Sequence, residues 1–72
     1  MRFFFNVLID DEEVPDFEGT DLANRDAAQA EAYDIAEELR RNFSDYSNAT
    51  VIEVRTLSGE RVFSLPVTLG RN

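Results

Sequence analysis

The chain has 72 residues, contains no cysteine or histidine, and carries 15 acidic and 7 basic residues, for a net charge of −8. This length predicts one small domain, residues 1–72, and the composition excludes disulfides and thiolate zinc sites and removes the commonest general base. Every basic residue is an arginine and the longest basic run is Arg40–Arg41, so we expect no direct nucleic-acid partner and no membrane partner, both of which require clustered positive charge.

The hydropathy pattern and the small size bear on location and association. No apolar run approaches the roughly 20 residues that span a bilayer, and acidic residues follow the first apolar stretch directly, unlike a signal peptide. The absence of cysteine fits a reducing cytoplasm, where we expect the protein. A single core of this size supplies only about 3–5 kcal/mol of net folding stability. We therefore expect association with another chain to stabilise the protein further.

Residues 2–9 (RFFFNVLI) predict a strand that is apolar on both faces. One face carries Phe3, Phe5, Val7 and Ile9. The other face carries Phe4 and Leu8 around Asn6. A strand with this pattern is typical of a central position that is covered on both sides.

The next segment is acidic and contains a proline and a glycine. Four consecutive acids, residues 10–13, predict a solvated turn because like charges repel. Residues 14–17 predict a short strand, and Pro15 places it at a sheet edge because it has no N–H to donate. Gly19 ends this strand and indicates a positive φ or a tight bend.

Residues 25–41 predict the one helix, with Asn24 as its N-cap. Its inward stripe is mostly alanine and consists of Ala28, Ala32, Ile35, Ala36 and Leu39, extended by Phe43. Its outer face is acidic and consists of Asp26, Asp34, Glu37 and Glu38, with Gln29 and Tyr33. Glu37 and Arg41 are spaced for an ion pair. Because the stripe is small, the helix can approach a sheet closely.

Residues 42–48 are polar and turn-rich, with Phe43 and Tyr46 as anchors, and residues 50–67 predict a hairpin about Ser58-Gly59. A two-residue turn there sets the register of the two strands. It pairs Val54 with Phe63 and Ile52 with Leu65 on one face, and Glu53 with Ser64 and Arg55 with Val62 on the other. Pro66 ends the last strand.

The predicted order is β-β-α-β-β, an α+β domain with one antiparallel sheet and one helix packed on one face. The helix leaves the second face of the sheet uncovered. The apolar residues expected on that face are Phe4, Leu8, Val51 and Val62. We interpret them as a homodimer interface or a site for another partner.

The sequence resembles a family of short, mostly alphaproteobacterial proteins classed as a domain of unknown function. Three matched segments carry the resemblance: RFFFNV from Arg2; Asp16, Glu18, Gly19 and Leu22, with Ala27 and Ala28 in the following helix; and Ile52-Glu53-Val54 with Gly59 and Pro66. It covers nearly the whole chain. Asn6 stands where many members carry His, and Asn24 where many carry Asp. The resemblance implies the architecture and no activity.

The acidic segment is the clearest candidate for a binding surface. We interpret its acidic residues as a surface for a basic protein partner. These residues are Asp10, Asp11, Glu12, Glu13, Asp16 and Glu18. With Asp21 it could supply oxygen ligands to Ca²⁺, but its spacing does not match a calcium loop. We favour a solvated turn, and for Asp16 to Asp21 a structural role at the entry to the helix.

The sequence predicts no catalytic residue, no cofactor and no metal site. The serines have no histidine or lysine to activate them, and the Phe triplet lacks the interleaved bases of a nucleic-acid stacking platform. Two functions remain open. One is a non-enzymatic interaction module that forms a homodimer through its sheet. The other is an acidic regulator of a basic protein, antitoxin-like or a nucleic-acid mimic, since the β-β-α opening also resembles HicB-type antitoxins in topology.

Overall fold

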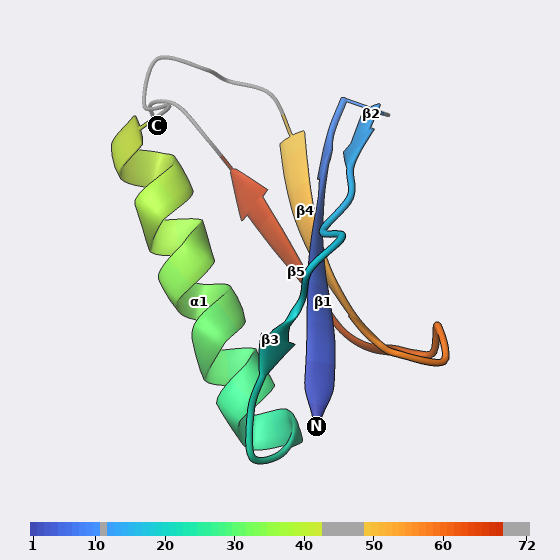
Figure 1. Ribbon diagram of the computed structural model, residues 1–72. Helices are drawn as coiled ribbons and strands as arrows, with labels where there is room; N and C mark the ends of the chain where they lie inside the picture. The colour runs from blue at the N-terminus through green and yellow to red at the C-terminus, as the bar shows by residue number, and fades with distance from the viewer. Residues whose placement is uncertain (11, 43–48, 69–72) are drawn as a thin grey trace.

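The computed structural model describes residues 1–10, 12–42 and 49–68. Its elements are β1 (Arg2–Ile9), β2 (Glu12–Val14), β3 (Thr20–Asp21), α1 (Arg25–Asn42), β4 (Ala49–Thr56) and β5 (Arg61–Thr68). The strands form one antiparallel sheet in the order β2-β1-β4-β5, and α1 lies along one side of it (Figure 1). The predicted α+β fold is therefore confirmed. The predictions for Asp11, Phe43 and Tyr46 lie outside the described residues.

β1 is the central strand, as its two apolar faces predicted. It pairs with β4 from Phe3 to Ile9, and on its other side with β2 near one end and β3 near the other. β2 and β3 together therefore act as one edge strand that is interrupted in the middle. The first connection differs from the prediction, because the acids Glu12 and Glu13 belong to β2 and the chain leaves the ladder at Pro15, whose nitrogen cannot donate.

The hairpin between β4 and β5 has a three-residue loop rather than the predicted two-residue turn. The Gly59 N–H donates to the Thr56 carbonyl, and the Thr56 N–H donates to the Glu60 carbonyl, both at 2.9 Å. Gly59 has φ 95°, as this loop type requires of its last residue. The longer loop shifts the register near the turn by one residue.

A bulge further along the hairpin restores the predicted register. Arg55 pairs with Arg61 and not with Val62, so that prediction is wrong. The irregularity at this point leaves Val62 as the extra residue. Beyond it, the predicted pairs Val54 with Phe63, Glu53 with Ser64 and Ile52 with Leu65 are all confirmed. The prediction that Pro66 ends the last strand is wrong, because β5 continues through it to Thr68.

The core lies between α1 and the sheet. The helix contributes only alanines to its fully buried part, Ala28, Ala32 and Ala36, each at most 1% exposed. The strands contribute the bulk: Phe3, Phe5, Ile52, Val54 and Val67. As predicted, Asn24 caps the helix, because its Oδ1 accepts from the Ala27 N–H at 2.9 Å. The predicted partner of Glu37 is wrong, since the ion pair forms with Arg40 at 3.3 Å.

Gly19 occupies a position that no other residue fits. Its φ is 74°, a region that L-residues enter at a cost of about 1–2 kcal/mol. A Cβ at this position would lie 2.9 Å from the Phe3 carbonyl oxygen, and equally close to Arg2 Cγ and Phe4 Cε2. A backbone oxygen inside the sheet cannot move aside, so the loop needs glycine for both conformation and space.

We predict that Gly19→Ala destabilises the protein much more than Gly59→Ala. Both glycines have a positive φ, but a Cβ on Gly59 meets no atom within 4 Å, so only the backbone cost of about 1–2 kcal/mol applies there. At Gly19 the steric clash adds about 1–3 kcal/mol. Urea unfolding of both variants measures the difference, and equal losses would contradict the account of the Gly19 loop.

Candidate functional site

One face of the sheet is turned away from α1, and we call it the open face. Its centre is formed by three strands: Phe4, Asn6 and Leu8 of β1, Val51, Glu53 and Arg55 of β4, and Arg61, Ser64 and Pro66 of β5. By the same alternation, Arg2 of β1, Glu13 of β2 and Asp21 of β3 lie on this face at its edge. Their neighbours along each strand point into the core. Among the described residues, no helix or strand covers this face, and Figure 1 shows the helix only on the opposite side.

The cross-strand register arranges the open face in three rows. An apolar row joins Leu8, Val51 and Pro66. A polar row joins Asn6, Glu53 and Ser64. A third row joins Phe4, Arg55 and Arg61. The β1 and β4 members are half-buried, whereas the three β5 members are exposed, so the centre of the face is better packed than its rim.

Glu53 lies at the centre of the open face between two arginines. Its carboxylate accepts from Arg55 at 3.1 Å and from Arg61 at 3.4 Å, and its side chain is only 14% exposed. Arg55 is held in turn by a 2.7 Å hydrogen bond from its Nη1 to the Gly59 carbonyl. The cluster has one negative and two positive charges, and Glu13 adds a negative charge at the β2 edge of the same face.

Of the four residues predicted for an apolar interface, the open face brings three together. Leu8 and Val51 are direct cross-strand neighbours, and Phe4 lies two residues along β1 from Asn6. The Phe4 ring also contacts the chain at Gly19, so part of it is already covered. Val62 is placed differently, because the bulge lets it pack against the core cluster.

The predicted acidic partner surface is dispersed in the structure. Asp10, Glu12, Glu13 and Glu18 are exposed, but Glu12 pairs with Ile9 and Glu13 with Leu8, so the two point to opposite faces of the sheet. Within residues 1–10, 12–42 and 49–68, no group of three or more acidic side chains is close enough to hold a metal ion.

Asp16 is the exception among these acids, because its carboxylate is used inside the fold. Oδ1 accepts from the N–H groups of Glu18 and Gly19 at 3.2 and 3.0 Å. Oδ2 accepts from the Phe5 N–H at 3.1 Å. The Asp16 N–H donates to Asn6 Oδ1 at 2.8 Å. The side chain therefore replaces the backbone partner that β1 lacks between β2 and β3. This structural role differs from the predicted one, since Asp16 supports β1 and not the entry to the helix.

The surroundings of Asp16 favour its charged form. Burial of the carboxyl raises the pKa of Asp16, whereas the hydrogen bonds from the three backbone N–H groups lower it. The nearby charge of Arg2 adds to the lowering, so the pKa of Asp16 lies below the ordinary value. Arg2 itself is fixed by the Glu18 carbonyl at 2.7 Å and by Asp21 at 3.1 Å.

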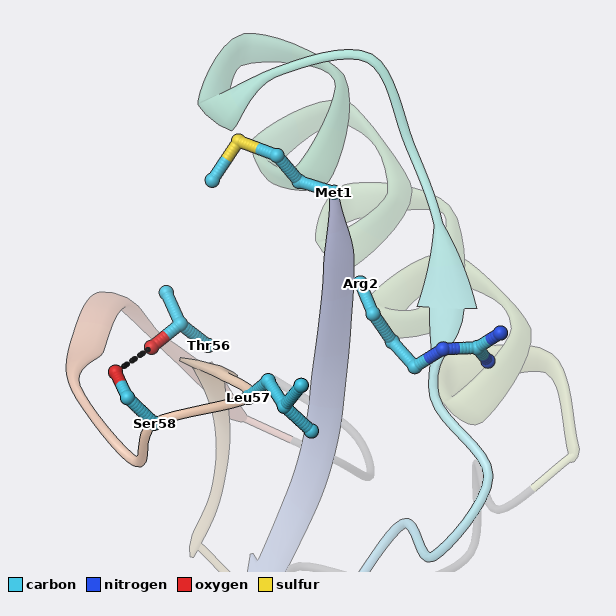
Figure 2. A pocket seen from close by; sticks show the side chains of 5 residues that line it. All are labelled: Met1, Arg2, Thr56, Leu57 and Ser58. Atoms are coloured by element: carbon cyan, nitrogen blue, oxygen red, sulfur yellow. Dashed lines mark hydrogen bonds between the residues drawn. The ribbon is translucent and has the colours of Figure 1, made fainter.

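A depression of about 570 Å³ lies where β1 begins and the β4–β5 loop turns. It is lined by Met1, Arg2, Thr56, Leu57 and Ser58 (Figure 2). Met1 and Leu57 are 64% and 77% exposed, and the Thr56 and Ser58 hydroxyls hydrogen-bond to each other at 3.0 Å. The guanidinium of Arg2 points away from these hydroxyls in Figure 2. The lining is mainly apolar, with Arg2 as a charged side chain.

The sequence alone did not reveal the centre of the open face. The alternation within residues 51–55 correctly predicted that Glu53 and Arg55 lie on the face of β4 that is turned away from the helix. The pairing of Asn6 with Glu53, however, depends on β1 and β4 being neighbours. Strand order is not contained in local patterns. The pairing of Arg55 with Arg61 depends on the bulge, for which the only local signal was the Gly59 turn.

The family model described as a domain of unknown function (DUF6894) matches residues 2–68. No curated protein and no solved structure shows a significant match to the chain. Among the described residues, no helix combines the length and apolar character that a membrane crossing needs.

We predict that Asp16→Asn destabilises the fold by about 1–3 kcal/mol at neutral pH, because an amide turns one acceptor into a donor that faces an N–H group. The folded pKa of Asp16 is lowered, so its stabilisation is complete above the unfolded pKa and is lost as the pH falls toward the folded pKa. The gap between wild type and variant should therefore narrow at acid pH in thermal unfolding experiments. Asp34→Asn, on the exposed face of α1, is the control, and an equal effect there would contradict this role.

Proposed function

The chain belongs to the family described as a domain of unknown function (DUF6894), and we propose that it is a non-catalytic interaction module that pairs with a second copy of itself through the open face. The observation that supports this most is the open face itself. It carries half-buried Phe4, Leu8 and Val51 on one side of a sheet whose other side is covered by α1. Burying such apolar surface contributes about 25 cal/mol per Å².

The distribution of charge favours the open face as the place where two copies meet. The whole chain carries a charge of −8, so two copies repel each other in most orientations. The outer face of α1 exposes four acids, Asp26, Asp34, Glu37 and Glu38. The open face carries Glu53 between Arg55 and Arg61 and Glu13 at its β2 edge, so two open faces bring fewer unpaired acids together than two helix faces do.

A non-catalytic role agrees with the chemistry of the described side chains. The chain has no histidine and no cysteine. The carboxylate of Asp16 accepts hydrogen bonds from backbone N–H groups within the fold, and that of Glu53 is paired with Arg55 and Arg61. The depression at Met1 and Leu57 is lined by apolar groups, by Arg2, whose guanidinium points away in Figure 2, and by two hydroxyls that hydrogen-bond to each other.

A second candidate function is an acidic regulator that binds a basic protein. The acids on the outer face of α1 support it, because of these only Glu37 forms an ion pair with another described residue. The two functions differ in their response to salt. An apolar interface survives high ionic strength, whereas an acidic-to-basic complex weakens as salt screens its charges.

We predict that Val51→Glu raises the dissociation constant of the homodimer by about 100-fold or more, because it buries an unpaired carboxylate in the interface. Val14→Glu is the matched control, since Val14 is 57% exposed on the edge strand β2 and outside the open face. Sedimentation velocity across a concentration series measures both constants.

Circular dichroism of the two variants checks that each remains folded. A third variant, Leu8→Ser, lies in the same apolar row as Val51 and disrupts the open face more mildly. Equal dissociation constants for Val51→Glu, Leu8→Ser and wild type would remove the open face as the dimer interface. Loss of the dimer in Val14→Glu alone would place the interface at the β2 edge instead.

A further inference from the structure

The three rows of the open face are complementary to one another in a way that specifies how two copies would pack. Across the two central strands, Phe4 pairs with Arg55, Asn6 with Glu53, and Leu8 with Val51. The register places two groups of complementary chemistry opposite each other in every pair: an aromatic ring and a guanidinium, an amide and a carboxylate, and two apolar side chains. Contacts of these three kinds can form between chains.

We propose, building on the proposed function, that two copies pack face to face about a two-fold axis that runs parallel to β1 and β4, midway between them. This rotation exchanges the β1 and β4 columns and keeps each row in place. Phe4 then lies over the second copy's Arg55, Asn6 over its Glu53, and Leu8 over its Val51. Sheets packed in this way lie about 10 Å apart with strands rotated by about 30°, so the correspondence holds best near the axis.

The central contact has the strongest structural support. Asn6 Oδ1 accepts from the Asp16 N–H at 2.8 Å, which fixes the amide and leaves its NH₂ group to donate elsewhere. The carboxylate of Glu53 accepts from Arg55 and Arg61 at its edges and has lone pairs left for a donor from the second copy. A carboxylate with a 14% exposed side chain gains from each further hydrogen bond, because its hydration is already reduced.

The other contacts of this arrangement are also favourable. The guanidinium of Arg55 is positioned by Gly59 and would meet the face of the second copy's Phe4, a cation–π contact. Leu8 and Val51 would bury each other at the apolar end of the face. Since the axis generates every contact twice, all three types occur in duplicate.

Alternative axes produce like-with-like contacts. An axis perpendicular to the strands through the polar row would place Glu53 over the second copy's Glu53 and Leu8 over its Phe4. An axis along β4 would also oppose the two Glu53 carboxylates, and an axis along β1 would oppose the two Asn6 amides. Among these axes, only the one between β1 and β4 makes all three rows complementary.

Cross-linking of single-cysteine variants tests the direction of the axis. The wild-type chain has no cysteine, so Phe4→Cys, Leu8→Cys and Val51→Cys each introduce one thiol. The variants are mixed in pairs and treated with a bismaleimide that bridges about 10 Å, the spacing of packed sheets. We expect Leu8→Cys to cross-link with Val51→Cys and not with Phe4→Cys. The reverse result would overturn the proposed axis while leaving the homodimer in place.

A charge exchange tests the central contact and the position of the axis. Asn6→Asp keeps the oxygen that accepts from Asp16 but places a carboxylate over the second copy's Glu53, so we expect the dimer dissociation constant to rise about tenfold or more. Adding Glu53→Gln in the same chain restores a donor–acceptor pair between copies and should return the constant to within about threefold of wild type.

Failure of the double variant to recover, in a protein that still forms a wild-type dimer, would show that Asn6 and Glu53 do not face each other across the interface. Absence of a wild-type dimer at any concentration would instead remove the proposed function, and with it this arrangement. The two failures are therefore distinguished by the mass of the wild-type protein alone.

Discussion

The rest of the structure depends on the close packing of a single alanine-faced helix on one side of the sheet. Ala28, Ala32 and Ala36 are buried against large strand residues such as Phe3 and Ile52, so nearly all the core volume comes from the sheet. Small side chains let the helix and sheet backbones approach closely, and a well-filled core follows. This helix covers only one face of the sheet, however, so the apolar residues on the other face must be covered in a different way.

The edge of the sheet shows how a conspicuous acidic motif can be structural. Asp16 and Gly19 lie where β1 has no backbone partner, between β2 and β3. The carboxylate accepts three backbone N–H groups, and the glycine lets the loop pass against the Phe3 carbonyl. These two residues let the loop supply the hydrogen bond that β1 lacks at this point. Arg2 of β1 donates a hydrogen bond to the Glu18 carbonyl and so holds the same loop against the strand. These contacts explain the motif without a ligand.

Local patterns in the sequence predicted the elements better than their connections. The helix with its Asn24 cap, the central β1, and the pairing of Ile52 with Leu65 all follow from periodicity and capping. The first edge strand was misplaced, because four adjacent acids suggested a turn, yet Glu12 and Glu13 are tolerated where β2 faces water. The hairpin has a longer loop than predicted and a bulge at Val62. The bulge offsets the extra loop residue, so the pairs from Val54 with Phe63 outward keep the predicted register.

The candidate site was predictable only in part, because it is made by neighbours that are distant in the sequence. Alternation within residues 51–55 predicted that Val51, Glu53 and Arg55 share a face. Their pairing with Leu8, Asn6 and Phe4 required the adjacency of β1 and β4, which no local pattern contains. The apolar residues of the open face are its most conspicuous feature in the sequence. In the proposed dimer, however, the Glu53 cluster at the centre specifies how the two copies are oriented, since charges discriminate among arrangements that apolar contacts tolerate.

The most direct test of the central claim is the mass of the wild-type protein in solution, measured by light scattering at low and high salt. We predict a mass of twice the 8.2 kDa chain at both ionic strengths, because the apolar surface of the open faces is buried between the two copies. A mass of one chain at both ionic strengths would contradict it. A dimer that dissociates as salt is added would also contradict it, by showing that exposed charges rather than the apolar rows hold the copies together.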